Sequence, residues 1–333
     1  MNQGSVFDTT GLNQGLKIEE GLVKVSDAIE CTVSYAICSG KLKRKSAEID
    51  VLLKSAFDCR NCDQQKAIKE ELQILSNMEK HPNVLALIGY VQTSFRLLIV
   101  TECPEGGNLQ QFLKTFSDES FHNQLSDDKK SYKQNNWILD SDLKSLCTFD
   151  LISFSLQLAR GMEYLAQNGL NNYWLLTLQN VLVAGNKTMR IANFYLASRD
   201  SDNIGEEFRE PPSKPSTPLT DNSTTFQEDS RQFAICLHGL FTLGGTLYEG
   251  VEDLKEYLEN GGQLPKSKYC HMEIENFMLQ CWNEDPLARP IYALCVQFFE
   301  DHIEQYNLQL RDQIENKLFE ASKIQEALKL GDN

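Results

Sequence analysis

The chain contains 333 residues, of which 41% are hydrophobic and 24% are charged, and its formal net charge at pH 7 is -15. This is the composition of a globular chain that can bury a large core, and the length allows one two-lobed domain or two ordinary domains. The acidity argues against a nucleic-acid partner or an anionic membrane surface, since both repel a negative protein.

The ten cysteines are too scattered for a disulfide framework. Cys59 and Cys62 form one C-x-x-C pair, but no second pair follows at a zinc-site spacing, so ordinary loop cysteines are favoured over a metal or redox role. Residues 1–16 lack the pattern of a signal peptide, and no apolar run approaches the roughly 20 residues that span a bilayer. We therefore expect a cytoplasmic chain without a membrane segment, which can also be the intracellular part of a receptor-like protein.

In the first third of the chain, apolar runs at residues 51–53 and 97–100 predict buried strands. Between them, residues 64–80 place apolar side chains at helical spacing and predict one helix. The rest of the chain is mostly helical in pattern, with amphipathic helices predicted at residues 149–165, 237–243 and 274–281.

Two polar stretches interrupt this pattern. Residues 117–136 are charged and poor in large apolar groups, and residues 201–229 hold four prolines among Ser, Thr and acidic residues. Both are predicted to be surface loops.

The tail, residues 306–330, is predicted to be a helix that either packs on the body or is offered to a partner. Charged residues separate its apolar residues, which fall near helical spacing. These apolar residues are Leu310, Ile314, Leu318, Ile324 and Leu328.

Five motifs follow one another along the chain. Residues 81–84 are His-Pro-Asn-Val, residues 102–109 are Glu-Cys-Pro-Glu-Gly-Gly-Asn-Leu, and residues 157–165 are Gln-Leu-Ala-Arg-Gly-Met-Glu-Tyr-Leu. Residues 241–245 are Phe-Thr-Leu-Gly-Gly, and residues 281–290 contain Cys-Trp, Asp-Pro and Arg-Pro. In order, the motifs resemble the turn after the regulatory helix, the hinge, the helix before the catalytic loop, a large-lobe turn and the closing signature of tyrosine kinases.

Over about residues 17–303, the chain thus resembles the intracellular domain of a receptor tyrosine kinase of the type that carries a kinase insert. The resemblance implies an α+β, two-lobed protein-kinase-like fold, with a small β-rich N-lobe that holds one regulatory helix and a larger α-helical C-lobe. The expected divisions are an N-terminal tail (1–16), a kinase-like domain (17–303) with N-lobe (17–101), C-lobe (102–303), kinase-insert-like loop (117–146) and degenerate activation segment (193–229), and a C-terminal helix (304–333).

A kinase cradles phosphates with a G-x-G-x-x-G loop, because glycine lets backbone amides approach the phosphates closely. In the alignment that the resemblance implies, the glycine positions hold Ser26, Ala28 and Cys31. Glu30 stands where an aromatic residue caps the phosphates, and it adds a negative charge there. Since residues 18–43 contain no G-x-G in any register, we expect no phosphate cradle.

The lysine of the V-A-I-K motif is present as Lys54, and Glu71 lies at the distance of its helix partner, so an ion pair between them is predicted. Leu52 replaces the small alanine that packs on adenine, and with Val33 and Leu182 it is expected to fill part of the adenine site. In the alternative, the backbone shifts slightly and ATP still fits. The residual nucleotide pocket comprises Lys54, Glu71, Leu52, Thr101, Cys103, Asn180 and Leu182.

The catalytic loop lacks its base in this alignment, because Tyr173, Trp174 and Leu175 stand where His-Arg-Asp belongs. Leucine cannot accept a hydrogen bond from a substrate hydroxyl or take its proton. The preceding segment is one residue longer than usual, which can bring Asn171 and Asn172 close, but amides are not bases. No catalytic residue is therefore predicted here.

The Asp-Phe-Gly motif is replaced by Asn193, Phe194 and Tyr195. Asn193 offers a neutral carbonyl, whereas Mg²⁺ prefers carboxylates, and Asn180 alone is a weak ligand. Tyr195 replaces the glycine that lets this segment flip, so the switch is expected to be frozen. We expect no magnesium site, and ATP binding that is weak or absent.

The activation segment lacks its Ala-Pro-Glu motif. Arg289, whose usual partner is that glutamate, must then pair elsewhere or face solvent. Asp229 stands where an aspartate braces the catalytic loop and is expected to be structural, and Thr217 before Pro218 is a candidate phosphosite of a common type.

Because the base, the magnesium aspartate and the glycine loop are all replaced, the resemblance points to a catalytically inactive, tyrosine-kinase-like pseudokinase. We expect an allosteric regulator or scaffold in signalling, whose partner is an active kinase or a signalling adaptor. Candidate contact surfaces are the helix around Glu71, the insert with Tyr132 and the tail. Two alternatives stay open: a nucleotide-binding pseudokinase switch, which Lys54, Glu71 and the small gatekeeper Thr101 favour, and a weakly active atypical kinase.

Overall fold

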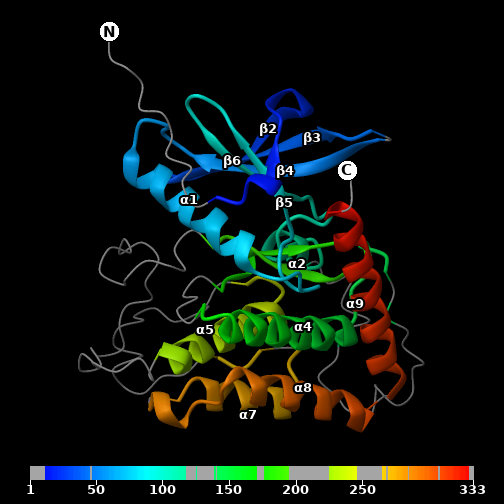
Figure 1. Ribbon diagram of the computed structural model, residues 1–333. Helices are drawn as coiled ribbons and strands as arrows, with labels where there is room; N and C mark the ends of the chain where they lie inside the picture. Colours follow the sequence, from blue (N-terminus) through cyan, green and yellow to red (C-terminus); the bar gives the residue numbers. More distant parts are fainter. Residues whose placement is uncertain are drawn as a thin grey trace.

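The computed structural model of the chain divides into a lobe dominated by β-sheet and a lobe dominated by helices (Figure 1). It describes residues 12–45, 47–117, 125, 139, 141–170, 176–194, 225–245, 265–267, 269–283, 285–306 and 308–329. The predicted α+β, two-lobed class is confirmed.

The N-lobe is built on a six-stranded sheet with the order β1-β5-β6-β4-β3-β2, in which only the pair β1–β5 is parallel. Val51 and Leu53 of the central strand β4 pack into a small apolar cluster on one face of the sheet. By strand alternation, Leu52 and Lys54 lie on the opposite face. The strands are β1 (Lys17–Ile18), β2 (Val23–Cys31), β3 (Tyr35–Lys43), β4 (Glu48–Ala56), β5 (Leu87–Gln92) and β6 (Leu97–Glu102).

Helix α1 (Cys62–Asn77) overlaps the helix predicted over residues 64–80. The Asn61 side chain starts it by accepting hydrogen bonds from two amides of the first turn. Ile68 and Leu72 are fully buried and hold the helix against the sheet. Glu71, on the same face, is thereby buried as well.

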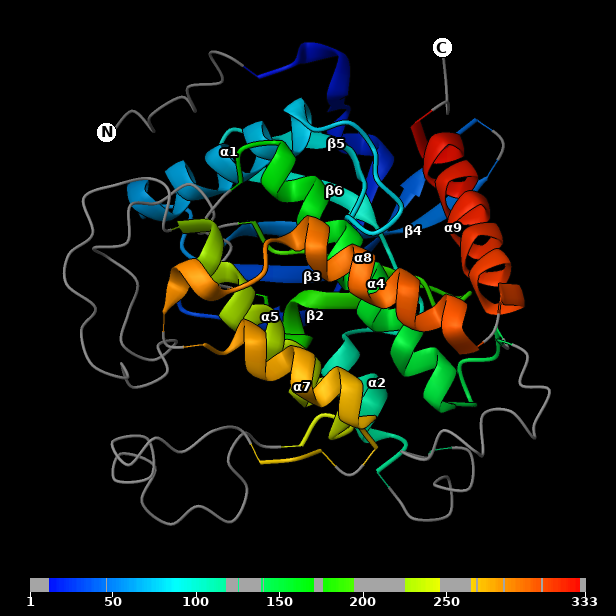
Figure 2. The ribbon, with the colours of Figure 1, turned by 90° about the horizontal axis from the view of Figure 1, so that it is seen from below.

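The C-lobe is organised around α4, whose side chains are almost all buried. Helices α8 and α5 pack against α4, and α7 packs against α5 (Figure 2). The helices predicted at residues 149–165, 237–243 and 274–281 overlap α4, α5 and α7. The C-lobe elements are α2 (Leu109–Lys114), α4 (Thr148–Gln167), α5 (Thr225–Phe241), α7 (Met272–Cys281), α8 (Tyr292–Tyr306), the strands β7 (Val181–Val183) and β8 (Met189–Ile191), and the short turns η4 (Leu178–Asn180) and η8 (Pro286–Ala288).

The His-Pro-Asn motif joins the two lobes. The Nδ1 atom of His81 accepts a hydrogen bond from the Asn83 amide at 3.1 Å. The fully buried Asn83 side chain donates to Gln157 of α4 at 3.1 Å and to the Met189 carbonyl at 3.3 Å. The motif therefore holds the segment that leads into β5 against the core of the C-lobe.

The tail forms helix α9 (Leu308–Lys329), which runs along the C-lobe and reaches the N-lobe sheet (Figure 1). Three of its apolar residues, Leu310, Ile314 and Leu318, are buried against the body. Of the two alternatives for the tail, the structure shows the packed helix. Ile324, also expected on the apolar face, is instead exposed.

Candidate functional site

Lys54 and Glu71 form the predicted ion pair, with Lys54 Nζ 2.7 Å from Glu71 Oε2. Both side chains are buried, and the Glu71 carboxylate also accepts a hydrogen bond from the Phe194 amide at 3.0 Å. Burial lowers the pKa of the Lys54 ammonium, whereas the carboxylates of Glu71 and Glu30 act in the opposite direction. The pair thus joins β4, α1 and the start of the activation segment.

Asn193 lies at the centre of the site. Its φ of 70° places it in the left-handed region, which asparagine tolerates better than most residues. Its Oδ1 atom accepts a hydrogen bond from Lys54 Nζ at 2.6 Å, and its Nδ2 donates to Asn180 Oδ1 at 3.0 Å. Asn193 and Asn180, which stand at the magnesium positions of the family, are therefore hydrogen-bonded to each other, and Asn193 also binds the lysine.

Tyr35 completes this cluster from the start of β3. Its hydroxyl accepts a hydrogen bond from Asn193 Nδ2 at 3.0 Å and donates to Glu30 Oε1 at 2.9 Å. Its ring lies under Lys54, with Nζ 4.3 Å from the centroid, the geometry of a cation–π contact. Burial raises the pKa of the Tyr35 phenol and Glu30 reinforces the shift, so the hydroxyl stays protonated and can donate.

Tyr35 was missed in the sequence analysis. The expected alignment placed the glycine-loop positions at Ser26, Ala28 and Cys31, whereas the turn between β2 and β3 lies later in the chain. The turn spans Thr32 to Tyr35, where the Thr32 hydroxyl accepts hydrogen bonds from the Ser34 and Tyr35 amides. Val33 lies at its tip and is 81% exposed, so the expectation that Val33 fills the adenine site is wrong. A Thr-x-Ser stretch between two strands is a signal that could have located this turn.

The remaining residues of the predicted pocket line the junction of the lobes. Leu52 is half-buried in β4, where it pairs with Thr101 of β6. Thr101 is buried. Cys103 in the hinge and Leu182 in β7 are both half-buried. Their role in holding or excluding a nucleotide stays a prediction.

Several predicted residues lie outside the described part of the chain. They include Tyr173, Trp174, Leu175 and Tyr195, together with most of the kinase-insert-like loop and of the activation segment. Arg289 is described and pairs elsewhere, as expected, since its Nε donates to the Asn283 carbonyl at 2.7 Å.

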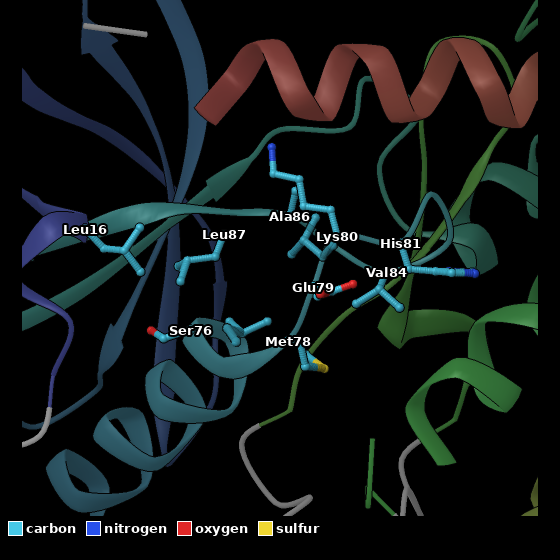
Figure 3. Close-up of a pocket in the computed structure, with 11 residues that line it drawn as sticks. Leu16, Ser76, Met78, Glu79, Lys80, His81, Val84, Ala86 and Leu87 are labelled. Atoms are coloured by element: carbon cyan, nitrogen blue, oxygen red, sulfur yellow. The ribbon is translucent and has the colours of Figure 1, made fainter. Parts of the chain in front are cut away.

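A pocket opens beside the C-terminal end of α1, where the chain leads into β5 (Figure 3). Leu16, Met78 and Leu87 are among its lining residues, and none of the predicted nucleotide-pocket residues lines it. In Figure 3, Lys80 extends from this pocket toward α9, where Lys80 Nζ donates to the Gln325 carbonyl. The pocket thus lies between the end of α1 and the start of β5, and Lys80 connects it to the tail helix.

Comparison with known proteins gives consistent matches. A family model described as protein tyrosine and serine/threonine kinase matches residues 24–299. The tyrosine-protein kinase receptor ver-3 of Caenorhabditis elegans is 34% identical over 337 residues, which cover 90% of this chain and 27% of ver-3. The receptor-like tyrosine-protein kinase kin-15 of the same species is 32% identical, covering 88% of this chain and 66% of kin-15. A fibroblast growth factor receptor of Ciona intestinalis is 32% identical, covering 78% and 34%.

The chain thus spans only part of each of these relatives, from 27% of ver-3 to 66% of kin-15. Among the described residues, no helix has the length and apolar character required to cross a bilayer.

Proposed function

This chain belongs to the protein tyrosine and serine/threonine kinase family, and from that premise we propose that it is a pseudokinase that neither transfers phosphate nor needs a nucleotide. The observation that carries the proposal is the closed cluster of Lys54, Asn193, Asn180 and Tyr35. In an active kinase, the lysine and the residues at the positions of Asn193 and Asn180 bind phosphates and magnesium. Here they bind one another.

The charges of the cluster support the absence of bound ATP. Besides its pair with Glu71, the Lys54 ammonium donates to Asn193 at 2.6 Å, so a donor position that a phosphate would use is taken by a side chain. Glu30, held by the Tyr35 hydroxyl, adds a negative charge close to Lys54. A triphosphate would have to displace Tyr35 and lie beside Glu30, so its binding is opposed by both packing and repulsion.

Magnesium binding is disfavoured by the chemistry of the available ligand. Asn193 replaces the expected aspartate, and its only oxygen ligand is engaged by a cation, Lys54. Mg²⁺ at protein sites is held by carboxylates together with substrate phosphates, and a neutral amide facing an ammonium does not fit that chemistry. We therefore derive no catalytic step through ATP or a metal.

A nucleotide-binding pseudokinase switch is the second candidate. The intact Lys54–Glu71 pair favours it, because this pair orients the phosphates of ATP in active kinases. In that case Tyr35 would move aside when ATP enters, and the stability of the chain would depend on the nucleotide.

We further propose that the chain regulates or scaffolds signalling through protein contacts, with an active kinase or an adaptor as partner. The relatives are named as receptor tyrosine kinases, which supports a signalling setting. Glu71 is buried and the apolar face of α9 is packed, so neither offers a contact surface directly. Adding the purified chain to an active receptor tyrosine kinase domain, and following the rate of peptide phosphorylation, tests this role.

Inactivity is tested by phosphate transfer from labelled ATP to a copolymer of Glu and Tyr, with Mg²⁺ or Mn²⁺. We expect incorporation no higher than that of a Lys54→Met preparation, because the stations for phosphate and metal are occupied by side chains. The variant carries the same contaminating kinases and serves as the matched control. Incorporation by the parent that Lys54→Met abolishes would refute the proposal and support the weakly active alternative.

A further inference from the structure

Three side chains that the kinase-like site does not use, His271, Glu273 and His302, lie close together where α7 and α8 pack against each other. Figure 2 shows these two helices at the base of the C-lobe. The Nδ1 atom of His302 lies 3.3 Å from Glu273 Oε2, and the Nδ1 atom of His271 lies 3.8 Å from the same oxygen. The three potential ligand atoms all lie within 4.8 Å of one another. Among the described residues, this is the one group of three such side chains close enough to share a metal ion.

The contacts to Glu273 are longer than a typical hydrogen bond. An N–H···O bond usually spans about 2.7–3.2 Å; the 3.3 Å contact of His302 lies just beyond that range, and the 3.8 Å contact of His271 lies well beyond it. Zinc–nitrogen and zinc–oxygen bonds measure about 2.0–2.2 Å, and the edge of a tetrahedron with such bonds is about 3.3–3.6 Å. The observed separations of 3.3 and 3.8 Å are therefore close to those between two ligands of one ion.

The surrounding packing holds the ligands in place. His271 immediately precedes α7, Glu273 lies in its first turn, and His302 lies on α8. The His302 ring stacks on Phe298, with centroids 5.9 Å apart, and Phe298 stacks on Phe277 of α7 at 4.0 Å. Both imidazoles are thus buried beside an aromatic wall, whereas Glu273 is 41% exposed and leaves a path from solvent.

We propose that His271, Glu273 and His302 bind a divalent transition-metal ion of the zinc class. Two imidazoles and one carboxylate suit such ions, whereas Mg²⁺ and Ca²⁺ favour oxygen ligands. Three protein ligands leave one tetrahedral position for water. The ion would tie the start of α7 to α8, and its role is to stabilise the C-lobe.

Zinc binding by the metal-free full chain, measured by titration against a chromophoric zinc indicator, tests this site. We expect one equivalent to bind, and we expect Glu273→Gln to weaken binding by at least about tenfold, because a ligand charge is lost. The exposed Glu320 of α9 provides the matched control: Glu320→Gln removes the same charge far from the cluster and should bind as the parent does. Zn²⁺ should also raise the melting temperature of the parent and of Glu320→Gln more than that of Glu273→Gln.

A thiol site is the competing source of zinc binding, since Cys59 is half-buried and Cys62 is exposed. The double variant Cys59→Ser/Cys62→Ser should keep its zinc, and Co²⁺ bound to the parent should show no thiolate-to-metal charge-transfer band. His302→Gln, which keeps a polar side chain of similar size, should weaken binding as Glu273→Gln does. The proposal is overturned if the parent binds no zinc, if binding survives unchanged in Glu273→Gln and His302→Gln, or if it disappears in the cysteine variant.

Discussion

Replacing Lys54 with Met is expected to lower the free energy of unfolding by about 3–5 kcal/mol, the usual cost of breaking a buried ion pair from one side. Glu71, with which Lys54 forms a 2.7 Å contact, would be left buried with an uncompensated charge. The change would also remove the hydrogen bond to Asn193 and the contact with the Tyr35 ring. Urea unfolding followed by circular dichroism measures the effect.

Two further variants separate charge from packing. In Lys54→Met/Glu71→Gln, the buried charge is gone and the amide oxygen can still accept the Phe194 hydrogen bond, so most of the lost stability should return. Lys41 pairs with Asp50 on the exposed side of the neighbouring strands, and Lys41→Met should change stability little. Equal effects of Lys54→Met and Lys41→Met would show that the buried pair does not form in solution.

Replacing Ile314 with Ala is expected to cost about 2–5 kcal/mol of unfolding free energy, because a fully buried apolar side chain of α9 would leave a cavity. Ile314 is 1% exposed, whereas Ile324 on the same helix is 56% exposed. Ile324→Ala therefore serves as the control and should change the urea midpoint only slightly. Similar small effects of both variants would mean that α9 is undocked and available to a partner.

The packed tail helix α9 contacts both lobes. On the C-lobe side, Arg160 pairs with Glu315 of α9 at 2.6 Å. On the other side, the buried Gln325 donates to the Glu102 carboxylate at 2.7 Å and to the Val84 carbonyl at 3.1 Å, beside the hinge. The side chain of Arg44 in the β3–β4 turn donates to the Leu328 carbonyl at the end of the helix. Helix α9 is thus held to the C-lobe near one end and to the N-lobe near the other.

Much of this arrangement is predictable from local sequence. The resemblance to the V-A-I-K motif, together with the distance of Glu71 before the His-Pro-Asn motif, predicted the ion pair between Lys54 and Glu71. The spacing in the tail predicted a helix with Leu310, Ile314 and Leu318 on one side, but it left open whether that side packs on the body or meets a partner. It failed at Ile324, because the packed face continues through Ala321 and Gln325, a small and a polar residue that hydropathy does not mark as buried.

Other features depend on contacts that no local pattern encodes. Tyr35 enters the site only because the β2–β3 turn lies at Thr32 to Tyr35, which shifts the register of the hairpin. His271 and His302 meet because α7 and α8 pack through Phe277 and Phe298, although they are 31 positions apart. Strand register and helix packing are set by the whole fold, so the contacts of Tyr35, His271 and His302 are seen only in three dimensions, although the Thr-x-Ser stretch marks the turn itself.

The central claim is that side chains occupy the positions where ATP and magnesium would bind. Thermal unfolding of the parent chain tests it most directly, measured with ATP alone, with ATP and Mg²⁺, and with ATP and Mn²⁺. Ligand at 100 times its dissociation constant stabilises a protein by about 2.7 kcal/mol, enough to raise the melting temperature by several degrees. We predict no shift in the parent under any of the three conditions. If ATP raises the melting temperature of Leu52→Ala but not of the parent, the result would indicate in addition that Leu52 fills the adenine site. A saturable rise in the melting temperature of the parent would contradict the claim and make the nucleotide-binding switch the better account.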